Sequence, residues 1–200
     1  MAVPHRESLF ECKISGAENI KTFSSILHYL RVLGKELLVE ATRDVLTFRT
    51  LNEAKTAYTS VSFHESFFEL NSYHLNVNTL RGNNEDGRNE QDVSFSGKMM
   101  IKYLVAITKS FRHAYTLKFT AEKCQTDYEF VFQLQGANRI VKTYRFKYSD
   151  TEVISAVFDD SQASHFRSMT KVLAQLFDHM HHSPEITILA TPDTFHIQSY

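Results

Sequence analysis

The sequence contains no tryptophan, two cysteines, three prolines and six glycines in 200 residues. So little glycine and proline excludes a collagen-like chain and leaves little room for low-complexity linkers. Cys12 and Cys124 both lie in strand-like runs, which predicts two buried free thiols in a reducing compartment. No apolar run approaches the length of a membrane span, and the first residues lack the apolar core of a secretory signal. The sequence therefore predicts a soluble intracellular protein.

The chain also has no excess of either charge. Lys and Arg number 22 against 23 Asp and Glu, for a formal net charge of −1. This balance excludes a globally basic nucleic-acid binder but is compatible with a locally basic face. Hydrophobic residues make up 42%, and 16 Phe with 9 Tyr supply enough large side chains for a substantial core.

The first part of the chain predicts a β-α-β-β-β module. Apolar and polar side chains alternate from Leu9 to Ser15, as in a half-buried strand. Apolar residues then recur at three- and four-residue steps from Ala17 to Leu33, which predicts a helix that ends at Gly34. Three strands are predicted after this helix, at residues 37–42, 45–50 and 56–63.

The same order recurs after a polar segment at residues 76–92, which has no apolar period and is predicted to be a surface loop. We expect a strand at 93–97, a helix at 98–111, and strands at 114–122, 127–135 and 141–148. The predicted fold class is α+β, with repeated β-α-β-β-β modules whose helices pack on one face of antiparallel sheets. The two modules together predict a first domain at residues 1–148.

An internal repeat follows this domain. Residues 149–164 are acidic at both ends with an apolar middle and are predicted to connect two domains. Beyond them, Glu185–Ser199 aligns without gaps to Glu36–Thr50, and the preceding helical patterns match with one gap. Residues 165–200 are therefore predicted to begin a second domain that stops before its third strand. We accordingly expect a fragment, a short isoform or an incomplete gene model.

Basic residues concentrate on the polar sides of the predicted helices, where acidic residues are scarce. A single lysine on a helix surface is ordinarily just solvated. The same segregation on separate helices favours contact with nucleic-acid phosphates without base recognition. The candidate nucleic-acid-binding residues are Lys21 and Arg31 on the first helix, Lys98, Lys102 and Lys109 on the second, and Lys171 on the third.

Patterns for catalysis or metal binding are weak. The histidines 179, 181 and 182 resemble a metal cluster, but no Cys, Asp or Glu at ligand spacing joins them, and His179 and His181 point to different helix faces. The adjacent acids Asp159 and Asp160 are the pair that would serve a metal-dependent nuclease. The sequence has no nucleophile elbow, triad pattern, HExxH or CxxC. We predict no catalytic residue, no metal site and no cofactor.

Several stretches resemble a known family. They are FRTLNEAKTAYTSVSFHESFF at 48–68, KMMIKYLVAITKS at 98–110, EKC at 122–124, NRIVKTYRFKY at 138–148, ISAVFDDSQASHF at 154–166 and PEITILATPDTFHIQSY at 184–200. Their order and spacing are similar to those of the sliding-clamp family, whose fold is that of proliferating cell nuclear antigen. Within it they resemble the DNA-damage checkpoint branch that supplies the "nine" subunit of the nine-one-one heterotrimer. The resemblance covers most of the chain from Phe10 to Tyr200.

The resemblance implies a non-enzymatic subunit that joins two related clamp subunits in a heterotrimeric ring around double-stranded DNA in the nucleus. It further implies that an ATP-driven clamp loader places the ring, which then serves as a platform for checkpoint and repair proteins. The candidate basic residues would lie on helices lining the channel, and no membrane partner is expected.

Three alternatives stay open at the level of sequence. A replicative processivity clamp would assemble as a homotrimer. A metal-dependent nuclease would act through acids such as Asp159 and Asp160. A protein scaffold would carry the same lysines only for solubility.

Overall fold

The computed structural model forms two compact units, Met1–Ser155 and Ala156–Tyr200. The boundary falls inside the stretch predicted as a connector, residues 149–164. The residues that the structure describes are 6–81, 93–124, 127–136, 138–151, 156, 161, 166–180, 182–191 and 194–199.

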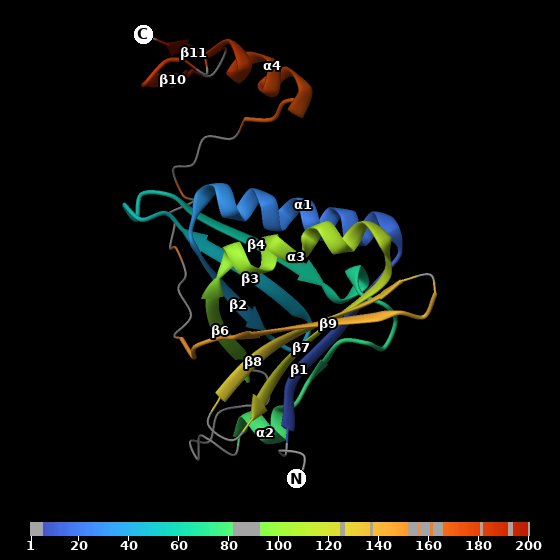
Figure 1. The fold of residues 1–200 in the computed structure, drawn as a ribbon. Coiled ribbons are helices and arrows are strands. Elements are labelled where there is room, and N and C mark those ends of the chain that lie inside the picture. Colours follow the sequence, from blue (N-terminus) through green and yellow to red (C-terminus); the bar gives the residue numbers. More distant parts are fainter. Residues whose placement is uncertain are drawn as a thin grey trace. The chain divides into compact units, whose positions relative to one another are not determined.

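The first unit contains a five-stranded and a four-stranded antiparallel sheet with helices α1 and α3 packed over them (Figure 1). The strand orders are β5-β1-β7-β8-β9 and β4-β3-β2-β6. The fold is therefore the expected α+β arrangement of antiparallel sheets with few helices. The elements are β1 (Arg6–Ser15), α1 (Ala17–Leu33), β2 (Glu36–Ala41), β3 (Val45–Leu51), β4 (Tyr58–His64), η1 (Glu65–Phe67), β5 (His74–Leu75), α2 (Val77–Arg81), β6 (Phe95–Met100), α3 (Ile101–Ile107), η3 (Thr108–His113), β7 (Ala114–Cys124), β8 (Asp127–Gly136) and β9 (Val141–Lys147).

The two β-α-β-β-β modules exchange their first strands. β1 pairs with β7 of the second module, from Arg6 opposite Cys124 to Ser15 opposite Thr116. Conversely, β6 pairs with β2 of the first module. Each sheet therefore contains strands from both modules, so the modules share one hydrophobic core rather than merely lying side by side.

The apolar side of α1 forms the centre of this core. Phe23 is fully buried, with its ring centroid 5.7 Å from that of Phe48, 5.6 Å from Phe63 and 6.3 Å from Phe111. Burying one such side chain contributes about 1.5–3 kcal/mol to folding. The helix ends at Gly34, where a Cβ atom would lie 2.1 Å from Thr50 Oγ1. Only glycine allows this close approach between the end of α1 and β3.

The second helix begins later than its sequence predicts. Residues 98–100 belong to β6, where Phe95, Gly97 and Met99 are buried in alternation, and α3 starts at Ile101. The pairing of β6 with β2 extends to Glu36 opposite Met100 and so holds these residues extended. The expectation that this helix begins at residue 98 is therefore wrong, because residues 98–100 still belong to the strand.

The polar segment at 76–92 is not all loop. Residues Val77–Arg81 form the short helix α2. The Asn76 carboxamide oxygen accepts a hydrogen bond from Thr79 N, and Leu80 packs against the core. The remaining residues of the segment, 82–92, lie outside the described residues.

The first described residues of the predicted connector attach to the first unit. Ser149 forms an antiparallel bridge with Lys98, and Ser96 Oγ donates a hydrogen bond to Thr151 O at 2.6 Å. This short segment therefore covers part of the outer edge of β6.

The second unit comprises α4 (Thr170–Met180) and a hairpin of β10 (Ile186–Ala190) and β11 (Phe195–Ser199). Its hairpin reproduces that of β2 and β3 at the aligned positions: Val39 pairs with Phe48, and Ile188 pairs with Ile197. The turns also match, because Thr42 N donates to Val45 O and Thr191 N to Thr194 O. The internal repeat found in the sequence is thus present in the backbone.

Candidate nucleic-acid interface

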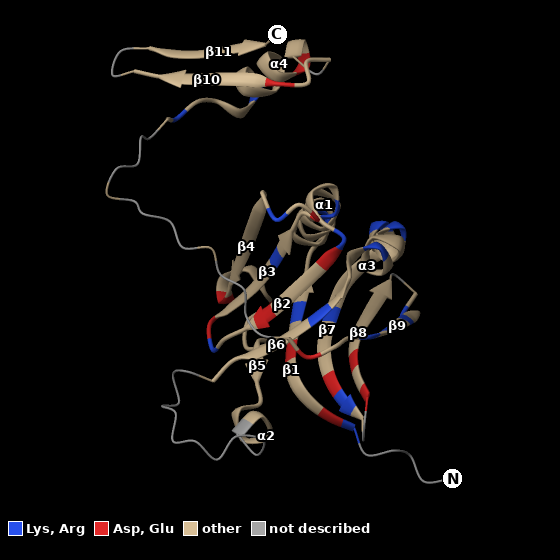
Figure 2. Ribbon diagram, turned by 90° about the vertical axis from the view of Figure 1, so that its left-hand side faces the viewer, with Lys and Arg blue, Asp and Glu red and all other residues tan. Residues whose placement is uncertain are grey.

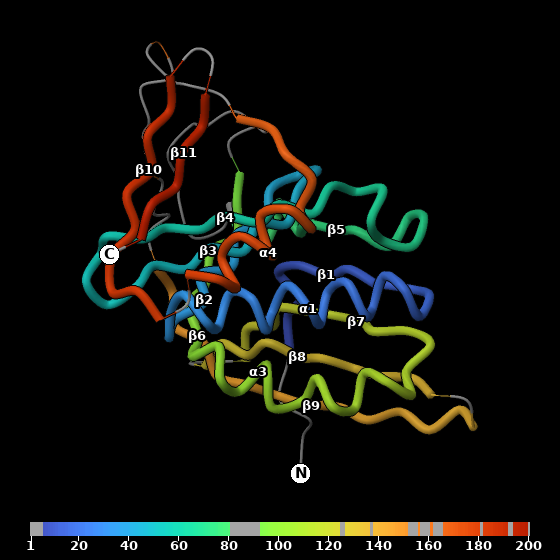
Figure 3. The backbone as a smooth tube through the Cα atoms, turned by 90° about the horizontal axis from the view of Figure 1, so that it is seen from above, coloured from blue at the N-terminus to red at the C-terminus, as the bar shows by residue number. Residues whose placement is uncertain are grey.

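The helix α1 lies beside the continuous helical segment of α3 and η3 (Figure 3). A groove is lined by residues of both. The two walls run antiparallel. At one end Ile101 N, where α3 starts, donates to Lys35 O just beyond α1, and at the other Gly16 N donates to Tyr115 O. The groove has a volume of about 820 Å³ and an apolar floor that includes Ile20, Val105 and Phe111.

A hydrogen bond joins the two walls. His28 Nε2 lies 3.0 Å from Thr108 Oγ1, and that hydroxyl donates to Val105 O at 2.8 Å. Because the single hydroxyl proton of Thr108 is used in the second bond, His28 Nε2 must carry the proton in the first. The bond holds α1 against η3 along the groove.

Basic side chains line both walls. α1 contributes Lys21 and Arg31, and the opposite wall contributes Lys102, Lys109 and Arg112. All five are exposed, and Glu18 is the acidic residue among those that line the groove. Lys21 and Arg31 are separated by about 15 Å along the axis of α1, from the helical rise per residue.

The antiparallel course of the walls gives the groove two cationic ends. Lys21 faces the end of η3 that carries Arg112, and Arg31 faces the start of α3 that carries Lys102. The structure thus brings Lys21, Arg31, Lys102 and Lys109 to one groove and adds Arg112, while their contact with nucleic acid stays a prediction. The basic character of Arg112 was visible in the sequence, but the 3₁₀ turns that carry it to the groove were not.

Lys98 does not belong to this groove. It lies in the middle of β6 rather than on a helix, and its Nζ is 3.3 Å from Glu36 Oε1 of the neighbouring strand. Its assignment to a helix face is therefore wrong, because the pairing of β6 with β2 holds Lys98 in a strand opposite Leu38, within reach of Glu36 two residues along. Its contact with nucleic acid stays a prediction.

Lys171 is exposed in the first turn of α4. It lies in the second compact unit, whereas the groove belongs entirely to the first. Its contact with nucleic acid stays a prediction.

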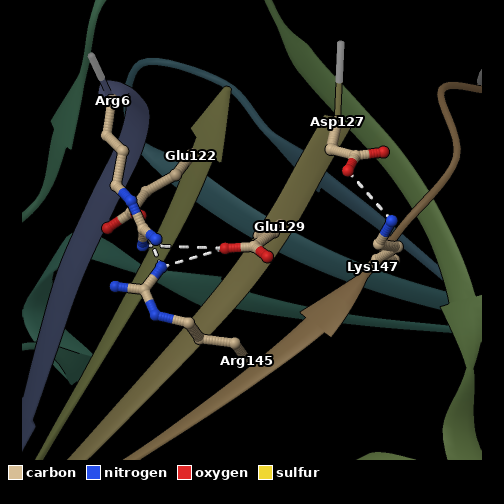
Figure 4. A network of polar contacts seen from close by, with 6 residues as sticks. All are labelled: Arg6, Glu122, Asp127, Glu129, Arg145 and Lys147. Carbon is tan, nitrogen blue, oxygen red and sulfur yellow. Dashed lines mark hydrogen bonds and ion pairs between the residues drawn. The ribbon is translucent and has the colours of Figure 1, made fainter. Parts of the chain in front are cut away.

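Several cations of the sheets, unlike those of the groove, have acidic partners. Figure 4 shows Arg145 Nη1 bonded to Glu122 at 2.8 Å and to Glu129 at 3.0 Å, with Arg6 beside the same two acids. The hydrogen bond that Arg145 donates to Glu122 is the main cause that raises the pKa of Arg145. Further pairs on the sheets are Lys13–Glu69, Arg49–Glu40, Lys118–Glu11 and Lys147–Asp127.

The groove cations have no ion pair with any acid in the part of the chain that the structure describes. Lys102 is 5.1 Å from the ring centroid of Tyr103, a cation–π contact. Figure 2 shows the basic residues of α1 and α3 on the helical layer, while acidic and basic residues are mixed over the sheets. One face of the unit is therefore positive although the whole chain is near neutral.

Chemistry other than anion binding has little support among the described residues. No group of three His, Cys, Asp or Glu side chains in those ranges has the geometry to hold a metal ion. Burial raises the pKa of the Cys12 thiol well above its ordinary value, which opposes a nucleophilic role. Asp159, Asp160 and His181 lie outside the described residues. None of the described helices combines the length and apolar character needed to cross a membrane.

The family model for Rad9 matches residues 23–200, which takes in the second unit and all of the groove except its lining residues before position 23, Lys21 among them. The chain belongs to the Rad9 family. Membership confirms the resemblance to the checkpoint clamps and the clamp fold. Rad9 proteins are subunits of the checkpoint clamp, a scaffold-type rather than a catalytic family that generally acts on DNA in the nucleus.

Proposed function

We propose that this Rad9-family chain is one subunit of a heterotrimeric nuclear ring that encircles double-stranded DNA at sites of damage. The observation that supports it is the groove between α1 and α3, whose lysines and arginines lack acidic partners among the described residues. Paired cations on the sheets are already neutralised, so the helical layer is the face best suited to a polyanion.

Contact with the duplex is electrostatic and independent of sequence. Exposed Lys and Arg side chains neutralise phosphates and release condensed counterions without reading base edges. Such contacts are individually weak and permit sliding. A ring that encloses DNA needs no tight contact, so a nearly neutral chain with one positive face suffices.

Ring closure uses the free edges of the sheets. In the first unit β4 and β9 are terminal strands, so each presents one row of backbone groups without a ladder partner within its own sheet. Pairing these edges with strands of neighbouring subunits would continue the sheets around the ring.

The wider assignment follows from the family. We propose two related clamp subunits as partners, an ATP-driven loader, and checkpoint and repair proteins as clients, with no catalytic activity in the chain itself. We also propose the domain limits 1–148 and 165–200, joined by residues 149–164, and Lys171 as a further phosphate contact from the second unit.

Co-expression with two related clamp subunits, followed by mass measurement of the purified assembly, tests this function. A complex with one copy of each chain is expected. A homotrimer of this chain would instead support a replicative processivity clamp, and a chain that recovers neither partner would contradict the ring. Chelator-sensitive cleavage of DNA, abolished by Asp160→Asn, would favour the nuclease alternative.

A further inference from the structure

A second hollow lies beside the groove, at the end of the five-stranded sheet. It has a volume of about 230 Å³ and is bounded by the β8–β9 hairpin on one side and η3 on the other. The residues that line it are Ser110, His113, Ala114, Leu134, Gly136, Asn138, Ile140 and Lys142.

The segment η3 is the ridge between the hollow and the groove. Its residues Lys109 and Arg112 line the groove, whereas Ser110 and His113 line the hollow. Ala114, the first residue of β7, lines both. The phosphate backbone of a duplex that follows the groove beyond Arg112 would therefore reach the β8–β9 hairpin next.

The cations of β9 divide by sheet face. Lys142 and Tyr144 are two residues apart and share a face, and the Tyr144 hydroxyl lies 2.9 Å from Ser110 Oγ of η3. This is the face that carries the helices. Arg145 and Lys147 lie on the opposite face, where both form ion pairs.

Lys142 resembles the groove cations in its surroundings. It is exposed, and it has no ion pair with an acid of the described ranges. Arg139, also exposed and without such a pair, lies in the hairpin turn with a positive φ of 56°. The exposed side chains of Ile140 and Val141 lie between these two cations.

We propose that the β8–β9 hairpin, through Lys142 and Arg139, is a second phosphate-contacting site that extends the duplex-binding surface beyond the helices. This inference rests on the proposed function, because the groove supplies the first part of the track. The ligand is double-stranded DNA, bound by its phosphate backbone. Ile140, which lines the hollow with Lys142, packs against the sugar edges between the two contacts.

Fluorescence anisotropy of the full chain with a labelled duplex in low salt tests the site. Lys142→Glu is compared with Lys102→Glu/Lys109→Glu in the groove and with Lys123→Glu. Lys123 is the matched control, since it lies near the far end of β7 and has no acidic partner within the described residues. We expect Lys142→Glu to raise Kd at least about three-fold and Lys123→Glu to leave it unchanged.

The outcomes separate the two proposals. If the groove variant weakens binding and Lys142→Glu matches Lys123→Glu, the hairpin site is overturned and the groove stands. If the wild-type chain does not bind, or neither variant matters, both DNA contacts are overturned. If Lys142→Glu spares DNA binding but lowers recovery of a clamp partner, the hairpin is a protein interface and the nucleic-acid proposal fails. Arg139→Asn, which suits a positive φ, must weaken binding as well if the hairpin contacts phosphates.

Discussion

At Gly97 a single methyl group is expected to reverse the usual effect of a glycine substitution. Replacing glycine by alanine in a strand ordinarily stabilises by about 0.5–1 kcal/mol. A Cβ at Gly97, however, would lie 2.7 Å from the ring of Tyr148, which stacks on Phe130. We expect Gly97→Ala to destabilise the chain by about 1–3 kcal/mol, measured by urea unfolding.

A double-mutant cycle identifies the cause. Tyr148→Leu removes the ring that the new methyl group meets, so the cost of Gly97→Ala should largely disappear in that background. An undiminished cost would show that Tyr148 is not the source of the strain.

The two cysteines are expected to differ in reactivity. Cys12 is fully buried and its thiol pKa is raised by burial, with a smaller contribution from Glu11, whereas Cys124 is only half-buried. Iodoacetamide should therefore modify Cys124 well before Cys12 in the native chain, as mass spectrometry of timed samples would reveal. Equal labelling in denaturant is the control, and equal labelling in the native chain would contradict the burial of Cys12.

Between elements, Thr108 is expected to hold α1 against η3. Thr108→Val removes the hydroxyl that accepts from His28 and donates to Val105 O. Val105 O keeps the bond from the backbone N–H of residue 108, and the exposed His28 ring can bond to water instead. We therefore expect a loss of about 0.5–1.5 kcal/mol in unfolding free energy, the net contribution of an ordinary hydrogen bond. Thr22→Val, at an exposed position of α1, is the matched control. Equal stability of the two variants would mean that the bond between the walls contributes nothing.

Local patterns predicted most elements but not the pairing between them. The alternation in β7, β8 and β9 and the helical period of α1 are properties of single segments, and the structure confirms these elements. The stretch KMMIKYL satisfies both periods, and only its pairing with β2 makes residues 98–100 a strand. Lys98 was misplaced for that reason.

The exchange of β1 and β6 between modules is a long-range feature. Nothing in the alternation of β1 indicates that its partner is β7, more than a hundred residues away. The grouping of Lys21, Arg31, Lys102 and Lys109 on one groove does not depend on this pairing, because it follows from the polar sides of the helical segments. Their contact with nucleic acid stays a prediction.

For the whole molecule, the repeat carried more information than any single motif. Gapless alignment of two hairpins requires the same register and the same turn, and both are found. The separation of cations that have acidic partners from those that have none is also a property of the whole molecule. Which lysines have acidic partners depends on neighbouring strands, so the sequence predicted where cations lie but not which of them are neutralised.

The separation of paired from unpaired cations predicts how DNA binding depends on salt concentration. Lys102→Gln/Lys109→Gln removes two cations without ion-pair partners in the described ranges, so fewer counterions are released when the chain binds duplex DNA. Binding titrations at several salt concentrations should give a slope of log K against log salt that is less negative by about 2.

Lys118→Gln/Lys147→Gln is the matched control, because it removes the same charge from the sheets, where the lysines pair with Glu11 and Asp127. It should leave the slope within about 0.5 of the wild-type value. If both double variants changed the slope equally, net charge rather than the groove would govern binding, and the argument from unpaired cations would fail. A change confined to the groove variant would instead mean that the phosphates lie against α3 and η3.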